Sequence, residues 1–175
     1  MTKFVALPDE RIRQKSDEVV AFDKNLKKLI KDLIEISEEQ HNPPALGMAA
    51  PQIGVFKRVF VAKIRNKFKP FVNPKIVKTS PNEGAYLEGC FSVPGIYGHV
   101  IRPLEVTVEA QDQNGKKITK SLKGLPAKII QHETNHLDGI LFIDHTYDQN
   151  GKLFKVEKDK KGNEELVELD FKQSQ

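Results

Sequence analysis

Two histidines and one glutamate stand at a spacing that could bind and use a metal ion. They lie in the segment His132-Glu133-Thr134-Asn135-His136. Residues four apart on a helix share a face, so both imidazoles would project together about one turn apart. That geometry suits two ligands of a tetrahedral metal ion, and Glu133 could reach a metal-bound water as a general base. The same pattern also occurs by chance on exposed helices, and this alternative stays open from the pattern alone.

The residues before this segment favour a buried helix face. Ile129 shares the face of His132 and His136, and Leu125 falls on the same side. Buried imidazoles need polar partners, because an unpartnered polar group in an apolar setting is costly. A metal ion supplies such a partner, and each remaining ring N–H can donate to an acceptor behind it.

A tetrahedral catalytic site also needs a third protein ligand and an open position for water. Asp144 and His145 follow the helix, but they come after residues 139–143, which we expect to form a strand. The single cysteine, Cys90, is the other candidate, and Gly89 lets the backbone approach closely there. A small buried hydrophobic residue is the alternative interpretation of a lone cysteine.

Three motifs together make the sequence resemble the peptide deformylase family. That family carries a glycine-rich GxGxAAxQ loop, an EGCxS motif and a QHExDHL helix, in this order. This chain has Gly47-Met48-Ala49-Ala50-Pro51-Gln52, Glu88-Gly89-Cys90-Phe91-Ser92 and Gln131-His132-Glu133-Thr134-Asn135-His136-Leu137. The resemblance covers roughly residues 4 to 145. It departs at Ala45, which replaces the first glycine and serves if only a small residue is needed, and at Asn135, which replaces an aspartate.

The resemblance implies one divalent metal ion, held by Cys90, His132 and His136. The family uses ferrous iron in the cell, and zinc, nickel or cobalt often replaces iron in preparations. Thiolate and imidazole ligands suit all of these ions, so the ligand set does not choose among them. Glu133 would deprotonate the attacking water and later pass the proton to the leaving amine.

The resemblance also assigns supporting and substrate-binding roles. The side-chain amide of Gln52 and the backbone N–H of Phe91 would donate to the developing oxyanion. Glu88 and Arg102 match positions that form a structural salt bridge without catalytic proton transfer. Gly47 would let the peptide pair as an added strand, and Tyr97 is a candidate for the substrate groove. Our candidates for the methionine pocket flank motif residues, and plain core packing is the alternative for each: Leu46, Leu125, Ile129.

On this resemblance, we expect the chain to remove the formyl group from the N-terminal formylmethionine of nascent polypeptides and to release formate. Two alternatives remain: a non-catalytic homologue that binds metal or formyl peptide, and a zincin-type metalloprotease. A cysteine far upstream of His132, with Gln52 before it, fits a deformylase better than a zincin. The presence of both Glu133 and Gln52 argues against the non-catalytic homologue.

The elements that must position these residues indicate an α+β fold, with mixed, mostly antiparallel sheets around a central helix that carries the two histidines. This helix begins near Pro126 and ends at about Gly139, since proline suits a first turn and glycine a helix end. Asp23 can cap an earlier helix that reaches about His41.

The remaining segments have β patterns. We expect strands over 55–64 and 71–77, and a hairpin of 104–110 with 117–122 through Asn114-Gly115. Residues 83–98, which contain Cys90, are expected to form a long loop because glycine and proline punctuate them. The tail over 146–175 is expected to form a β-hairpin.

Composition limits the class of protein. The chain has 175 residues, of which 38% are hydrophobic and 30% charged, which predicts one globular domain over 1–175 and a monomer. No apolar run approaches the ~18 residues of a membrane span, and no secretory signal is seen, so the cytoplasm is expected. The net charge of +4 is mild, and no nucleic-acid motif is present. Besides nascent formylmethionyl peptides, the ribosome exit region is a candidate partner.

Overall fold

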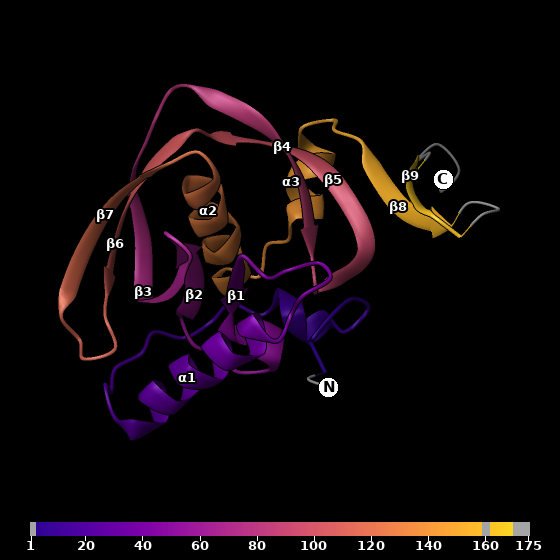
Figure 1. Cartoon of the computed structure of the whole chain (residues 1–175). Helices are drawn as coiled ribbons and strands as arrows, with labels where there is room; N and C mark the ends of the chain where they lie inside the picture. The colour runs from indigo at the N-terminus through magenta and orange to yellow at the C-terminus, as the bar shows by residue number, and fades with distance from the viewer. Residues whose placement is uncertain (1–2, 159–161, 170–175) are drawn as a thin grey trace.

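Three α-helices and two antiparallel sheets make up the computed structural model, which describes residues 3–158 and 162–169 (Figure 1). The helices are α1 (Lys24–Glu38), α2 (Leu125–Leu137) and α3 (Phe142–Asp148). The five-stranded sheet has the order β1 (Gly47–Ala49), β2 (Val59–Ile64), β3 (Lys67–Thr79), β6 (Glu105–Gln111), β7 (Lys117–Lys123). The four-stranded sheet has the order β4 (Glu83–Cys90), β5 (Val93–Pro103), β8 (Leu153–Lys158), β9 (Glu164–Glu168). The expected α+β class is confirmed.

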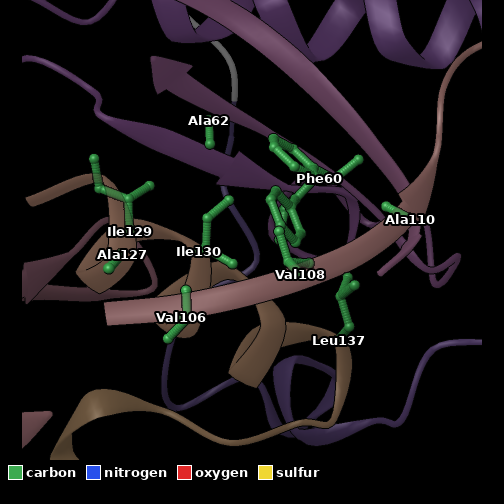
Figure 2. Close-up of a cluster of buried hydrophobic side chains, with 11 residues drawn as sticks. Phe60, Ala62, Val106, Val108, Ala110, Ala127, Ile129, Ile130 and Leu137 are labelled. Atoms are coloured by element: carbon green, nitrogen blue, oxygen red, sulfur yellow. The ribbon is translucent and has the colours of Figure 1, made fainter. Parts of the chain in front are cut away.

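Strand β2 separates two helices because its side chains alternate between the two faces of the sheet. Val59 and Val61 pack with α1, whereas Phe60 and Ala62 pack with α2. Figure 2 shows Ala127 and Ile130 of α2 beside Phe60, Val106 and Val108 of the sheet. The apolar side of α2 is thereby fixed, and its other side is left to carry the polar residues.

Helix α1 begins as the sequence predicts and ends earlier. The Asp23 carboxylate accepts hydrogen bonds from the N–H groups of Asn25 (2.9 Å) and Leu26 (3.1 Å). The helix ends at Glu38, so the predicted end near His41 is three residues too far. His41 instead forms an isolated antiparallel bridge with Pro44, where the chain reverses before β1.

The loop predicted over residues 83–98 is wrong. These residues form β4 and most of β5, which pair from Glu83 with Pro103 to Gly89 with Tyr97. Pro94 and Gly95, which indicated a loop, fall at an irregularity in the register, between the pair of Gly89 with Tyr97 and the pair of Cys90 with Val93. At such a bulge a missing N–H costs no ladder hydrogen bond, so Pro94 is tolerated inside the strand.

The strand expected over residues 139–143 is also wrong, because α3 begins at Phe142. The carboxylate of Asp144 accepts a hydrogen bond from the N–H of Leu141 (2.8 Å) and so supports the first turn. A short apolar run does not distinguish a strand from a buried helix segment, and here the local capping decides.

The other strand predictions are confirmed with shifted ends. The hairpin of β6 and β7 closes through a loop in which Gly115 has φ of +82°, a conformation that favours glycine. Strand β2 begins at Val59 instead of residue 55, and β3 extends over 67–79. The tail hairpin is present as β8 and β9. Residues 146–148 of the expected tail instead belong to α3, and residues 159–161 and 170–175 lie outside the described residues.

No helix in the described part of the chain is long and apolar enough to span a bilayer.

Candidate active site

A cavity of about 460 Å³ lies where β1, the end of β4, the start of β5 and α2 meet. Its wall includes Cys90, His132 and Glu133, which come from two of the three recognised motifs. Gly47 and Gln52 from the remaining motif line it as well. The fold thus gathers residues that are far apart in the sequence around one cavity.

Cys90, His132 and His136 form a cluster of candidate metal ligands, with one ligand atom of each lying within 4.8 Å of the others. Cys90 is the last residue of β4, and Sγ lies 3.1 Å from Nε2 of His136. The histidines lie one helical turn apart on α2, with ring centroids separated by 5.0 Å. This is the shared face that the four-residue spacing predicts.

Glu88 fixes the orientation of the His132 ring. Nδ1 of His132 lies 2.8 Å from Oε2 of Glu88. Burial would raise the pKa of Glu88, but hydrogen bonds from His132 and Arg102 outweigh burial and hold this pKa well below its ordinary value. An ionised carboxylate only accepts hydrogen bonds, so Nδ1–H donates and Nε2 keeps its lone pair for a metal.

Burial sets the protonation of the ligand cluster without metal. It lowers the pKa of His132, and it lowers the pKa of His136 well below the ordinary value, so both imidazoles are neutral. Burial raises the pKa of the Cys90 thiol to about 12. A divalent cation removes this obstacle, because a coordinating thiol is deprotonated. Two neutral imidazoles and one thiolate therefore fit a single divalent transition-metal ion.

The Glu133 carboxyl is buried beside this cluster and lies against β1. Its Oε2 has no hydrogen-bond partner within the described residues, and burial raises the pKa of Glu133 to about 8. A Cβ placed on Gly47 would be 2.5 Å from Oε1 of Glu133. Glycine at residue 47 is therefore needed for space, a reason that the sequence alone did not indicate.

The side chain of Gln52 is 2% exposed and is held at both ends. Its Oε1 accepts a hydrogen bond from the N–H of Ala49 (2.8 Å), and its Nε2 donates to Cys90 Sγ and to Ser92 Oγ, both at 3.3 Å. These bonds aim the amide N–H groups at the metal-ligand cluster. Phe91 also lines the cavity and lies in the tight turn between β4 and β5.

The ion pair expected between Glu88 and Arg102 is present and buried. Arg102 donates from Nε to Oε1 (2.6 Å) and from Nη2 to Oε2 (3.0 Å). Its Nη1 donates to Oδ1 of Asn135 (2.9 Å), and Nε2 of His145 donates to the same oxygen (2.9 Å). Asn135 thus supports the residues behind His132, and His145, considered above as a third ligand, lies outside the ligand cluster.

The predicted substrate-binding residues are only partly brought together. Leu46, Gly47, Ile129 and Tyr97 line the cavity, whereas Leu125 is 48% exposed and does not. Ala45 also lines it and has no positive φ, so alanine causes no strain there. Sequence reasoning missed several further lining residues, among them Phe4, Pro94, Ile96 and Lys128. Lys128 could have been found from its place four residues before His132.

Comparisons with known proteins show which family this chain resembles. The family model for polypeptide deformylase matches residues 1–152. The peptide deformylase of Rhizobium meliloti is 39% identical over 146 residues, which cover 81% of this chain and 82% of that protein. Peptide deformylase 2 of Clostridium acetobutylicum is 42% identical over 136 residues, covering 78% of this chain and 89% of that protein.

A solved structure agrees in fold as well as in sequence. The crystal structure of a peptide deformylase from Legionella pneumophila superimposes with a TM-score of 0.77 at 40% sequence identity. The match covers 83% of this chain and 85% of that one. The residues that the family model matches, 1–152, include all those that line the cavity. This chain therefore belongs to the polypeptide deformylase family.

Proposed function

We infer that this chain is a metal-dependent hydrolase that removes the formyl group from the N-terminal formylmethionine of nascent polypeptides and releases formate. One observation carries this conclusion. Cys90, His132 and His136 cluster in the same cavity as the buried carboxyl of Glu133 and the amide of Gln52. A zincin-type protease is not favoured, since the third candidate ligand here is a cysteine from a strand.

The chemistry divides among these residues. A divalent ion held by Cys90, His132 and His136 would supply Lewis acidity toward the substrate and its attacking water. Glu133 takes a proton from that water and delivers it to the leaving amine. Its place in the wall of the same cavity and the lack of a hydrogen-bond partner for Oε2 among the described residues support this role, because the carboxyl is free to contact a water molecule there.

Two donors stabilise the negative charge that develops on the formyl oxygen. Gln52 presents Nε2 toward the ligand cluster, with its orientation fixed by the N–H of Ala49. The backbone N–H of Phe91 would be the second donor, in the turn next to Cys90. Donors that are already oriented lower the barrier without reorganisation during the reaction.

The peptide would bind beside β1. This strand is at the edge of its sheet, since only β2 pairs with it among the described strands. A substrate can add to such an edge as another strand, with Gly47 leaving room for its backbone. Leu46 and Ile129 would receive the methionine side chain, and Tyr97 would lie along the groove.

Several finer points belong to the same proposal. The metal would be ferrous iron in the cell, with zinc, nickel or cobalt as substitutes. Helix α2 would be the central element of a single domain that works as a monomer in the cytoplasm. Nascent formylmethionyl chains would be the substrate, met near the ribosome exit region.

The test is release of formate from formyl-Met-Ala-Ser. Metal-free protein is loaded with Fe(II) without oxygen, and with Ni(II), Co(II) or Zn(II) in parallel. We expect formate and an equal amount of free peptide amine. Full metal occupancy without formate from any of these forms would reject the function and favour the non-catalytic homologue.

A further inference from the structure

One positively charged side chain in the cavity wall is not used by the chemistry described above. Lys128 lines the cavity and is partly buried. Within the described part of the chain, it is the only lysine or arginine of this wall, and Glu133 is the only acidic residue. Most of the other lining side chains are apolar or small, so a charge here faces the substrate in surroundings that screen it less than open solvent does.

Lys128 lies on α2 at a defined distance from the ligand cluster. It precedes His132 by four residues and therefore shares its face of the helix, about 6 Å away along the axis. Side chains on a helix lean toward its N-terminus, which directs Lys128 away from His136. Its charge still reaches the site: burial is the largest influence on the pKa values of His132 and Glu133, and the Lys128 charge lowers both.

Lys128 has no partner of its own. Other lysines form ion pairs, such as Lys123 with Glu105 (2.8 Å) and Lys28 with Asp32 (2.6 Å). Within the described residues, the side-chain ammonium of Lys128 forms no hydrogen bond or ion pair. An ammonium group that forms no ion pair inside the protein is available to bind an anion from a ligand.

We propose that Lys128 binds a side-chain carboxylate of the substrate, at one of the two residues that follow the formylmethionine. This rests on the function proposed above. A formylated N-terminus carries no charge, so the anion must come from a side chain. An extended peptide advances about 3.3 Å per residue, and two residues therefore span the roughly 6 Å between His132 and Lys128 along the helix. Lys128 is thus a specificity-determining residue for acidic N-terminal sequences.

Matched peptides test this preference. The peptides carry an amidated C-terminus, so that a side chain supplies the only carboxylate. The acidic and amide forms are compared at each position, as formyl-Met-Asp-Ser against formyl-Met-Asn-Ser, and formyl-Met-Ala-Asp against formyl-Met-Ala-Asn. In the wild type, we expect kcat/KM to favour the acidic peptide by about threefold to fivefold at one position, mainly through KM, and salt to reduce the ratio.

The variants isolate the charge. Lys128→Met should bring the ratio close to one, and Lys128→Arg should retain the preference. Lys27→Met is the matched control, because Lys27 is exposed on α1, lies outside the cavity and changes the net charge equally. This control should keep the wild-type ratio.

Binding of the same peptides to metal-loaded Glu133→Ala, followed by calorimetry, gives a second readout that needs no turnover. No formate from any peptide would reject the proposed function, while the binding ratio would still decide the role of Lys128. Equal affinity for acidic and amide peptides at both positions, or an unchanged ratio in Lys128→Met, would overturn the proposal.

Discussion

The carboxyl of Glu133 lies directly against the backbone of Gly47. A Cβ on residue 47 would be only 2.5 Å from Oε1 and 2.7 Å from the carboxyl carbon, which is closer than real Cβ contacts. The φ angle of Gly47 is not in the left-handed region, so the requirement is for space alone. Strand β1 thus forms one wall of the slot that holds the proposed general base.

Gly47→Ala should move this carboxyl while leaving the metal ligands in place. We expect kcat to fall by about 10- to 100-fold, because a displacement near 1 Å at a catalytic group has effects of this size. Metal content and the unfolding transition should stay near the wild type. Steady-state kinetics with metal analysis decide the matter, and an unchanged kcat would show that Glu133 does not need this position.

Glu88→Gln should weaken metal binding. The carboxylate of Glu88 accepts a hydrogen bond from Nδ1 of His132, and an amide oxygen is a weaker acceptor. Loss of such support behind a ligand typically lowers metal affinity by about 10- to 100-fold. Competition with a metal buffer measures the affinity. Glu105→Gln, which alters an exposed ion pair, is the control, and equal affinities in both variants would contradict the role of Glu88.

Asn135 should matter for stability through its side-chain oxygen, which accepts hydrogen bonds from Arg102 and His145. Asn135→Ala leaves both donors without this acceptor and should lower the free energy of unfolding by about 1–3 kcal/mol. Asn135→Asp keeps the acceptor and should stay closer to the wild type, with kcat/KM altered but not abolished. Urea unfolding at equal metal content compares them; an alanine variant as stable as the wild type would be inconsistent with this contact.

Glu133 should make the metal-free protein less stable as pH rises. Burial raises its folded-state pKa from 4.5 to about 8. Between these values the unfolded chain loses its proton while the folded chain keeps it, so the free energy of unfolding falls with rising pH. Glu133→Gln removes this titration. We therefore expect the free energy of unfolding of the wild type, relative to that of Glu133→Gln, to fall by roughly 3–5 kcal/mol between about pH 5 and pH 8.

Urea unfolding of chelator-treated protein at both pH values measures this difference. The histidine and cysteine ligands are the same in the two proteins, so their own titrations largely cancel. Parallel stability curves for the wild type and Glu133→Gln would mean that the carboxyl is solvated in the metal-free state.

Local sequence patterns predicted those features of the site that lie within a single helix or strand. The four-residue spacing placed His132 and His136 on one helix face, and Asp23 marked the start of α1 correctly. The three motifs, through the family resemblance, placed Cys90 and Gln52 in one site with the histidines, and the structure has both in the wall of the same cavity. Helical periodicity and recognised motifs are the strongest signals that a single sequence contains.

Contacts between elements were not predictable in the same way. Pro94 and Gly95 predict a loop over residues 83–98, yet these residues form β4 and most of β5, and Pro94 and Gly95 lie at a bulge within β5. Residues 139–143 contain both a turn and the start of α3, which depends on the carboxylate of Asp144. The link from Asn135 to His145 and the contact of Gly47 with Glu133 exist only after the elements pack.

The central claim is tested most directly by formate release from formyl-Met-Ala-Ser, with the wild type and Glu133→Ala brought to the same measured metal content. Equal metal content ensures that any difference reflects Glu133 and not the occupancy of Cys90, His132 and His136. We predict rapid formate release by the wild type and a loss of at least about 100-fold in the variant. Equal rates in the two proteins, or no formate from the metal-loaded wild type, would contradict the account.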